Sequence, residues 1–97
     1  MTLQIPDTIK ILGIPYKIKE IPLIDHDVAT EARINYWEQE IILSSALGPE
    51  KKEHALLHEM IHGMLYSFDH QFDNEQLVQS LASTLHQVIK DNRSLFL

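Results

Sequence analysis

The chain has 97 residues, a length that allows one domain with a small core and excludes a two-domain enzyme with an interdomain cleft. Eight Lys and Arg against fourteen Asp and Glu give a formal net charge of −6, and without a basic stripe to neutralise phosphates the chain is not expected to bind nucleic acid or an anionic membrane. It contains no cysteine, which excludes disulfides, Cys-ligated zinc ribbons, iron–sulfur clusters and thiol nucleophiles, so any metal site must use His and carboxylate ligands.

The first β signal lies between Thr8 and Ile21. Isoleucine side chains and Tyr16 alternate there with lysines, and this period of two is typical of strands with one side facing solvent. Gly13 and Pro15 interrupt the alternation. The segment is therefore expected to form two short antiparallel strands joined by a turn.

A second β signal follows a polar connection at Asp25-His26-Asp27 and extends from Ala32 to Leu43. Two runs rich in apolar residues flank a polar tip at Glu38-Gln39, which predicts another hairpin. The sheet is thus expected to contain three to four strands.

The pattern becomes helical after Ser45. Gly48-Pro49-Glu50 places a proline and then an acid where a helix begins. Apolar side chains then recur at helical spacing as far as Phe68. We expect one long helix over this segment.

A second helix is expected after a polar break at Asp69 to Asn74. Asp73 and Gln76 have the spacing of a capping box, and the apolar stripe that follows continues to about Asp91. Residues 1–97 are therefore predicted to form one α+β domain, with a small antiparallel sheet of two hairpins followed by two packed helices.

The first predicted helix contains the sequence His58-Glu59-Met60-Ile61-His62. The side chains of His58 and His62 stand about 40° apart and one turn along the same face, so both imidazoles can reach one metal ion. Glu59 projects about 100° from His58. Its carboxylate is thus placed to hydrogen-bond a water on the ion rather than to bind the ion itself.

Zinc suits this pattern because neutral imidazole is a good ligand for it and because a catalytic zinc keeps an open position for water. The ion lowers the pKa of that water toward about 7. A glutamate within hydrogen-bonding distance can then take the proton and return it to a leaving amine. The motif predicts Zn²⁺ as cofactor, Glu59 as general base and hydrolysis of an amide as the reaction.

Glu59 is the only formally charged residue between Ala55 and Phe68. An unpaired buried carboxylate costs several kcal/mol, so a partner is expected there, and a metal-bound water is one such partner. The alternative is a metal-free helix in which the two histidines bond to backbone groups and Glu59 points to solvent.

Two histidines leave the site one protein ligand short. The downstream candidates are Asp69, His70, Asp73, Glu75 and His86. Glu75 opens the second helix at the border of its apolar stripe, so its carboxylate meets His58 and His62 if the two helices pack together. Its alternative role is that of an ordinary acid in a first helical turn. His54, one turn before His58, is the substitute ligand.

The motif His58-Glu59-x-x-His62, followed by a glutamate on the next helix, resembles the gluzincin arrangement of zinc metallopeptidases. The order of hairpins, motif helix and glutamate helix is similar to that of the minigluzincins and of small phage- or prophage-type ImmA/IrrE-like peptidases. This resemblance implies that His58, His62 and Glu75 are the zinc ligands and that Glu59 is the general base. It also implies a peptide or protein substrate, which can be a single partner protein such as a repressor.

Gln79 departs from the gluzincin pattern, because larger gluzincins often have an acid at this position that orients a zinc histidine. Three tyrosines are candidate oxyanion donors: Tyr16, Tyr36 and Tyr66. The segment from Ile34 to Leu43 directly precedes the motif helix and is predicted to offer a sheet edge, to which an extended peptide adds as a strand.

Two other functions remain open from the sequence. One is a zinc-stabilised interaction module, in which the metal joins the two helices and nothing is cleaved. The other is a metal-free helical packing or dimerisation protein. The segment MTLQIPDTIK lacks the basic and apolar regions of a signal peptide, and a cytoplasmic location is predicted.

Overall fold

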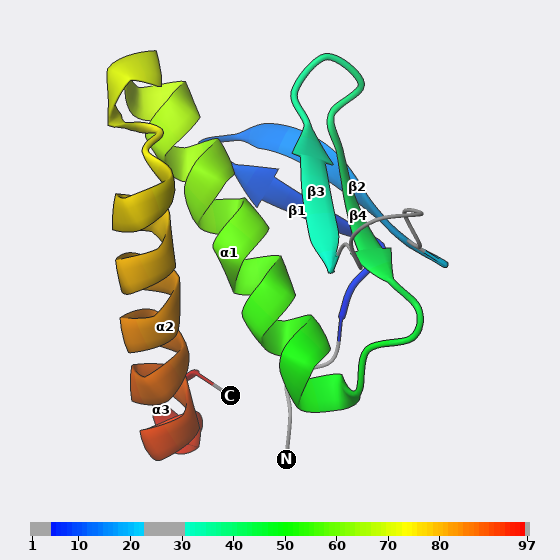
Figure 1. Cartoon of the computed structure of the whole chain (residues 1–97), viewed down its shortest axis with the longest axis vertical. Coiled ribbons are helices and arrows are strands. Elements are labelled where there is room, and N and C mark those ends of the chain that lie inside the picture. Colours follow the sequence, from blue (N-terminus) through cyan, green and yellow to red (C-terminus); the bar gives the residue numbers. More distant parts are fainter. Residues whose placement is uncertain (1–4, 23–30, 97) are drawn as a thin grey trace.

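The structure is a computed structural model that describes residues 5–22 and 31–96. Figure 1 shows strands followed by two long helices. The elements in chain order are β1 (Thr8–Ile11), β2 (Ile14–Ile21), β3 (Ala32–Asn35), β4 (Glu40–Ser44), α1 (Pro49–Phe68), the 3₁₀ turn η1 (His70–Phe72), α2 (Glu75–Asp91) and α3 (Arg93–Phe96). The predicted α+β class and both predicted hairpins are confirmed. The connection predicted at Asp25-His26-Asp27 lies outside the described residues.

The four strands form one sheet in the order β1-β2-β4-β3. Each hairpin is antiparallel, but β2 runs parallel to β4, with Ile18 opposite Ile41. The prediction of an antiparallel sheet is therefore wrong at its centre. The strand that follows β2 in the sequence, β3, lies at the edge of the sheet, and β4 lies next to β2. The alternation of side chains along a strand does not determine which strand becomes its neighbour.

The position of β4 also corrects the predicted substrate edge. Within the segment from Ile34 to Leu43, only β3 lies at an edge of the sheet, because β4 pairs with β2 on one side and with β3 on the other. Within this segment, a free row of backbone groups is thus available on β3 and not on β4.

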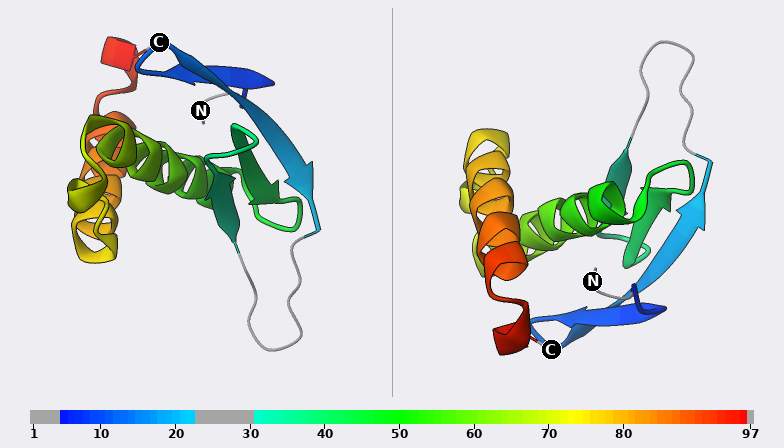
Figure 2. Two further views of the ribbon diagram at one scale, coloured as in Figure 1. Left: turned by 90° about the horizontal axis from the view of Figure 1, so that it is seen from above. Right: turned by 90° about the horizontal axis from the view of Figure 1, so that it is seen from below.

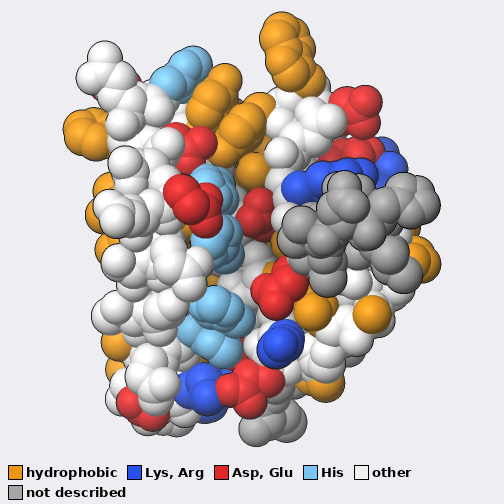
Figure 3. All heavy atoms as spheres, in the orientation of Figure 1, with side chains coloured by type: hydrophobic (Ala, Val, Ile, Leu, Met, Phe, Trp, Pro, Cys, Tyr) orange, Lys and Arg blue, Asp and Glu red, His pale blue; other side chains and the backbone are white. Residues whose placement is uncertain are grey.

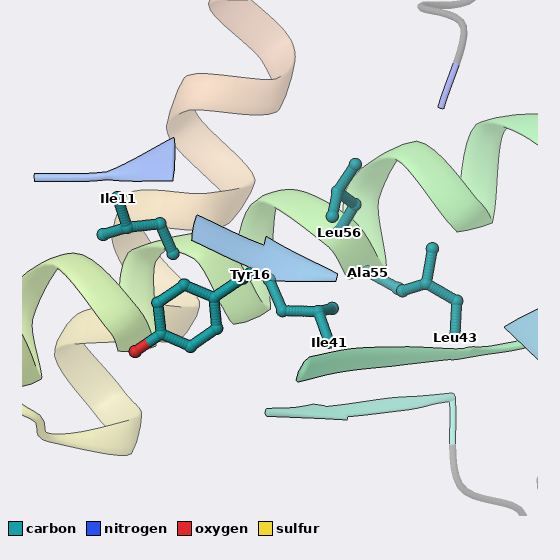
Figure 4. Close-up of a cluster of buried hydrophobic side chains, with 6 residues drawn as sticks. All are labelled: Ile11, Tyr16, Ile41, Leu43, Ala55 and Leu56. Carbon is teal, nitrogen blue, oxygen red and sulfur yellow. The ribbon is translucent and has the colours of Figure 1, made fainter. Parts of the chain in front are cut away.

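The main core lies between the sheet and α1. Alternation along β4 buries Ile41 and Leu43 completely, while Ile42 between them is only half-buried. Figure 4 shows these two side chains meeting residues of the first hairpin and of α1, namely Ile11, Tyr16, Ala55 and Leu56. Burial of this apolar surface holds α1 on the sheet.

The second helix packs on the opposite side of α1. Val78 and Ala82 of α2 are completely buried and contact Ile61 of α1. Figure 2 shows α1 between α2 and the sheet, and among the described residues α2 contacts α1 and α3 but no strand. Because α1 is covered on two sides, its sequence is apolar around most of its circumference. Within the described ranges, no helix is both long and apolar enough to span a membrane.

The start of α2 differs by one residue from the predicted capping box. Asn74 is the N-cap, and its Oδ1 accepts a hydrogen bond of 3.1 Å from the backbone N–H of Leu77. The carboxylate of Asp73 is engaged elsewhere, with His62 and Tyr36. The prediction of Asp73 and Gln76 as a capping box is therefore wrong, because Asp73 makes a tertiary contact instead.

Candidate metal centre

The two motif histidines face each other on the middle of α1. Their ring centroids are 5.0 Å apart. When two imidazoles bind one tetrahedral zinc, each ring centre lies about 3.2 Å from the ion and the centres lie about 5 Å from each other. The rings of His58 and His62 therefore already have the separation that a shared ion requires.

The first residue of α2 meets this histidine pair. Glu75 places Oε1 2.9 Å from Nε2 of His58 and Oε2 2.8 Å from Nε2 of His62. The contact follows from the packing of the helices, because Val78, one turn after Glu75, is buried against Ile61 of α1. The structure thus brings together three of the residues that the sequence singled out.

The carboxylates of Glu59 and Glu75 lie on the side of the histidines that would face an ion, and their environments differ. Glu59 is 7% exposed, and one ligand atom from each of His58, Glu59 and His62 lies within 4.8 Å of the others. The side chain of Glu75 is 68% exposed but touches both Nε2 atoms. We regard Glu75 as the better ligand, because it alone contacts both metal-binding nitrogens and is free to adjust.

The donor set fits a zinc ion. Two ligand atoms of a tetrahedral zinc are separated by about 3.3 Å, whereas the oxygens of Glu75 lie 2.8 and 2.9 Å from the imidazole nitrogens. Binding of an ion therefore requires the Glu75 oxygens to move away from these nitrogens. Two imidazoles and one carboxylate also form a common ligand set of catalytic zinc.

Asp73 orients one of the histidines. Its Oδ1 lies 2.6 Å from Nδ1 of His62, and its Oδ2 accepts a hydrogen bond of 3.0 Å from the hydroxyl of Tyr36. A proton on Nδ1 that is donated to Asp73 leaves the Nε2 lone pair of His62 directed at the centre. Asp73 therefore supplies the orienting acid that the sequence suggested was missing at Gln79.

This role of Asp73 was not found from the sequence. The sequence predicts Asp73 as a candidate metal ligand and as a helix cap, but not as a partner of a ligand. A general rule could have identified it, because zinc-binding histidines usually donate their other N–H to a carboxylate. The polar break offers just two aspartates for that purpose, Asp69 and Asp73.

Burial and neighbouring charges change the acidity of the site. Burial raises the pKa of Glu59 to about 7, although His62 acts in the opposite direction. Burial alone would lower the pKa of His62, but the hydrogen bond to Asp73 and the carboxylates of Glu59 and Glu75 outweigh it, so this pKa is raised. Burial and the hydrogen bond to Asp73 raise the pKa of Tyr36, which keeps its hydroxyl a donor.

A hollow of about 190 Å³ opens beside the motif. It is lined by His58 and Glu59 of α1, by Ala32 of the edge strand β3 and by Gln79 of α2, among others. Figure 3 shows histidine side chains in a row along the furrow between α2 and the strands. The hollow thus connects the reactive side chains with the free edge of the sheet.

The remaining candidates lie away from the histidine pair. The Asp69 carboxylate accepts the backbone N–H of Gln71 in η1, and the ring of His70 stacks on that of Tyr66. His86 is buried and bonds to Glu53 across the two helices. Burial lowers the pKa of His54, and His86 and His58 lower it further.

Among the candidate oxyanion donors, Tyr36 is linked most closely to the centre through Asp73. Tyr66 stacks on Tyr36, with ring centroids 3.9 Å apart, and Tyr16 is 3% exposed in the main core. Tyr66 and Tyr16 therefore support the position of Tyr36 and bury its ring.

No protein-family model, curated protein or solved structure matches this chain. The likeness to gluzincins rests on the motif and on the order of the elements, and membership of that family stays a prediction.

Proposed function

We propose that this chain is a small zinc-dependent metallopeptidase that hydrolyses a peptide bond with Glu59 as general base. The observation that carries the proposal is the contact of the Glu75 carboxylate with Nε2 of both His58 and His62, at 2.9 and 2.8 Å. Three ligands converge from two helices, as a catalytic zinc site with an open fourth position requires. His58, His62 and Glu75 would hold the ion.

When bound, Zn²⁺ would acidify a coordinated water and polarise the scissile carbonyl. Glu59 lies next to the ligands without bridging them, and its buried carboxyl group has a pKa of about 7. A carboxyl group at hydrogen-bonding distance from a coordinated water can accept its proton and return it to the leaving amine. Asp73 and Tyr36 keep the ring of His62 in position.

The substrate would bind as an extended strand along β3. The backbone N–H of Ser44 donates to the carbonyl of Glu31, so in this antiparallel pair Arg33 shares its hydrogen bonds with Ile42. The N–H and C=O groups of Ala32 and Ile34 consequently face the free edge. A peptide that pairs with them lies beside the hollow that Ala32 and Glu59 line.

Glu59→Gln is the decisive variant, because it removes the base and keeps the shape of the side chain. We expect this variant to bind zinc as the wild type does and to lose cleavage of a mixed peptide library, measured by mass spectrometry. Removal of one general base typically slows a reaction by about 10²- to 10⁴-fold. Unchanged cleavage by Glu59→Gln would overturn the proposed role.

A proline at the free edge tests the substrate site. Ala32→Pro removes an N–H that faces outward and leaves the bonds to β4 in place, so we expect a higher KM with retained zinc binding. Arg33→Pro is the matched control, because it removes an N–H that pairs with β4 and should lower stability instead. Normal cleavage by a folded Ala32→Pro variant would contradict strand addition.

A second candidate function is a zinc-stabilised interaction module. It is favoured by the same contact, because an ion held by Glu75 of α2 and by His58 and His62 of α1 would join the two helices. A wild-type chain that binds zinc and cleaves no peptide of the library would support this function. The phage association, the single protein partner and the cytoplasmic location stay predictions.

A further inference from the structure

A second pair of histidines lies where α1 and α2 meet, outside the proposed zinc centre. His54 of α1 and His86 of α2 have ring centroids 5.3 Å apart, with an angle of 28° between the ring planes. This separation is close to the 5.0 Å between His58 and His62. It also agrees with the separation of about 5 Å between two imidazoles that share one tetrahedral ion.

The environment of His86 repeats that of His62. Nε2 of His86 lies 2.8 Å from Oε1 of Glu53, a carboxylate that also accepts hydrogen bonds of 3.0 and 2.7 Å from Arg93. Glu53 is 2% exposed and is fixed in place by these contacts. Nε2–H of His86 therefore donates to Glu53, and in the neutral ring the lone pair lies on Nδ1, as in histidines that bind metals.

Space and a third donor are present beside this pair. A hollow of about 520 Å³ is lined by Glu50, Lys51, His54, Ser83 and His86. Glu50 lies one helical turn before His54 on the same side of α1. Its carboxylate is exposed and is paired with Lys90, and such surface pairs are weak enough to be exchanged.

We propose that His54 and His86, joined by Glu50, form a second binding site for a divalent transition-metal ion. Two imidazoles and a carboxylate select Zn²⁺, Ni²⁺, Co²⁺ or Cu²⁺ over Mg²⁺ and Ca²⁺. The second site is weaker than the first, because Glu50 has to leave Lys90 and because the charge of Lys51 opposes the ion. The proposal does not depend on catalysis or on Glu75.

The test is a calorimetric titration of the metal-free full-length chain with Zn²⁺. We expect the wild type to bind one ion with high affinity (the strong step) and a second ion with lower affinity (the weak step). His54→Ala should bind one ion fewer. The weak step should lose at least about 100-fold in affinity, because loss of an orienting partner alone costs roughly 10- to 100-fold. His58→Ala should show the converse and lose only the strong step. His70→Ala, which removes an imidazole outside both pairs, is the matched control and should titrate like the wild type.

A second measurement keeps the test independent of folding defects in the variants. Paramagnetic Ni²⁺, added to the wild type after one equivalent of diamagnetic Zn²⁺ has filled the first site, should broaden the NMR signals of the His54 and His86 rings. Unbroadened His54 and His86 signals, or equal stoichiometry for the wild type and His54→Ala, would overturn the second site.

If the titration shows the weak step but no strong step, the result contradicts the proposed zinc peptidase and supports the second site.

Discussion

Asp73 is the residue on which the orientation of His62 depends. The contact between Asp73 Oδ1 and His62 Nδ1 measures 2.6 Å, and Tyr36 holds the other oxygen of the carboxylate. A charged acceptor at Nδ1 increases the basicity of Nε2, the atom that would face the metal. The strength of metal binding should therefore depend on a residue that does not touch the ion.

We expect Asp73→Asn to weaken zinc binding by roughly 10- to 100-fold, because the amide can accept the Nδ1 proton but carries no charge. Competition with a chromogenic chelator measures this change. Asp69→Asn is the matched control, since Asp69 caps η1 and should leave zinc affinity unchanged. Equal affinities for the two variants would show that Asp73 has no orienting role.

At the scale of elements, α1 lies close to side chains of the sheet at Gly63, directly after His62. A Cβ atom at this position would lie 2.7 Å from Cδ1 of Ile11 and 3.1 Å from Cδ1 of Ile34. Both neighbours are ends of side chains in or against the main core. The absence of a side chain at Gly63 thus allows the motif helix to lie flat on the strands.

Gly63→Ala should lower the free energy of unfolding by about 1–3 kcal/mol through overpacking, partly offset by the better helix propensity of alanine. Ile11→Val alone should cost about 1 kcal/mol. The double variant should be more stable than the sum predicts, because the shorter valine removes the atom that the new methyl group meets. Urea unfolding of the four proteins measures this coupling, and additive effects would show that the clash is absent.

The elements that could be predicted are those with local signals. Gly13, the polar tip at Glu38-Gln39 and Pro49 mark turns or helix ends by their own backbone chemistry, and the structure has turns or an end there. The parallel pairing of β2 with β4 has no local signal, because alternation fixes a strand's faces but not its neighbour. The sequence therefore predicted the hairpins but not their assembly.

The candidate site shows the same division. The spacing of His58 and His62 and the apolar stripe of α2 sufficed to bring Glu75 to the pair, since both follow from helix geometry. Asp73 lies in a non-helical break, where the direction of a side chain depends on tertiary contacts. Its partners Tyr36 and His62 are 37 and 11 residues away. That distance explains why sequence reasoning missed its role.

At the scale of the whole molecule, the proposed ion would add a link between two helices that are already joined by an apolar cluster and by the contact of His86 with Glu53. A ligand that binds only the folded chain stabilises it by about 2.7 kcal/mol at a free concentration of one hundred times its Kd. For a domain of this size, each kcal/mol raises the Tm by roughly 4–8 °C. Zinc should therefore raise the Tm by roughly 10–20 °C.

Differential scanning calorimetry, with and without EDTA, measures this shift. Glu59→Gln should keep the full increase, because Glu59 is not a proposed ligand, whereas Glu75→Gln should lose most of it. Mg²⁺, which prefers oxygen ligands, is the control ion and should have no effect. A Tm that is the same with zinc and with EDTA would contradict a metal centre between the helices.

The packing of α2 on α1, with no strand beneath it, gives the molecule an unequal architecture. The sheet and α1 share one core, and α1 carries His58, His62 and Glu59, whereas the third proposed ligand lies on α2, which packs on α1 through a separate apolar cluster. The proposed metal centre is therefore complete only while α2 is docked on α1. A molecule that binds α2 and displaces it from α1 would thereby switch off the proposed activity.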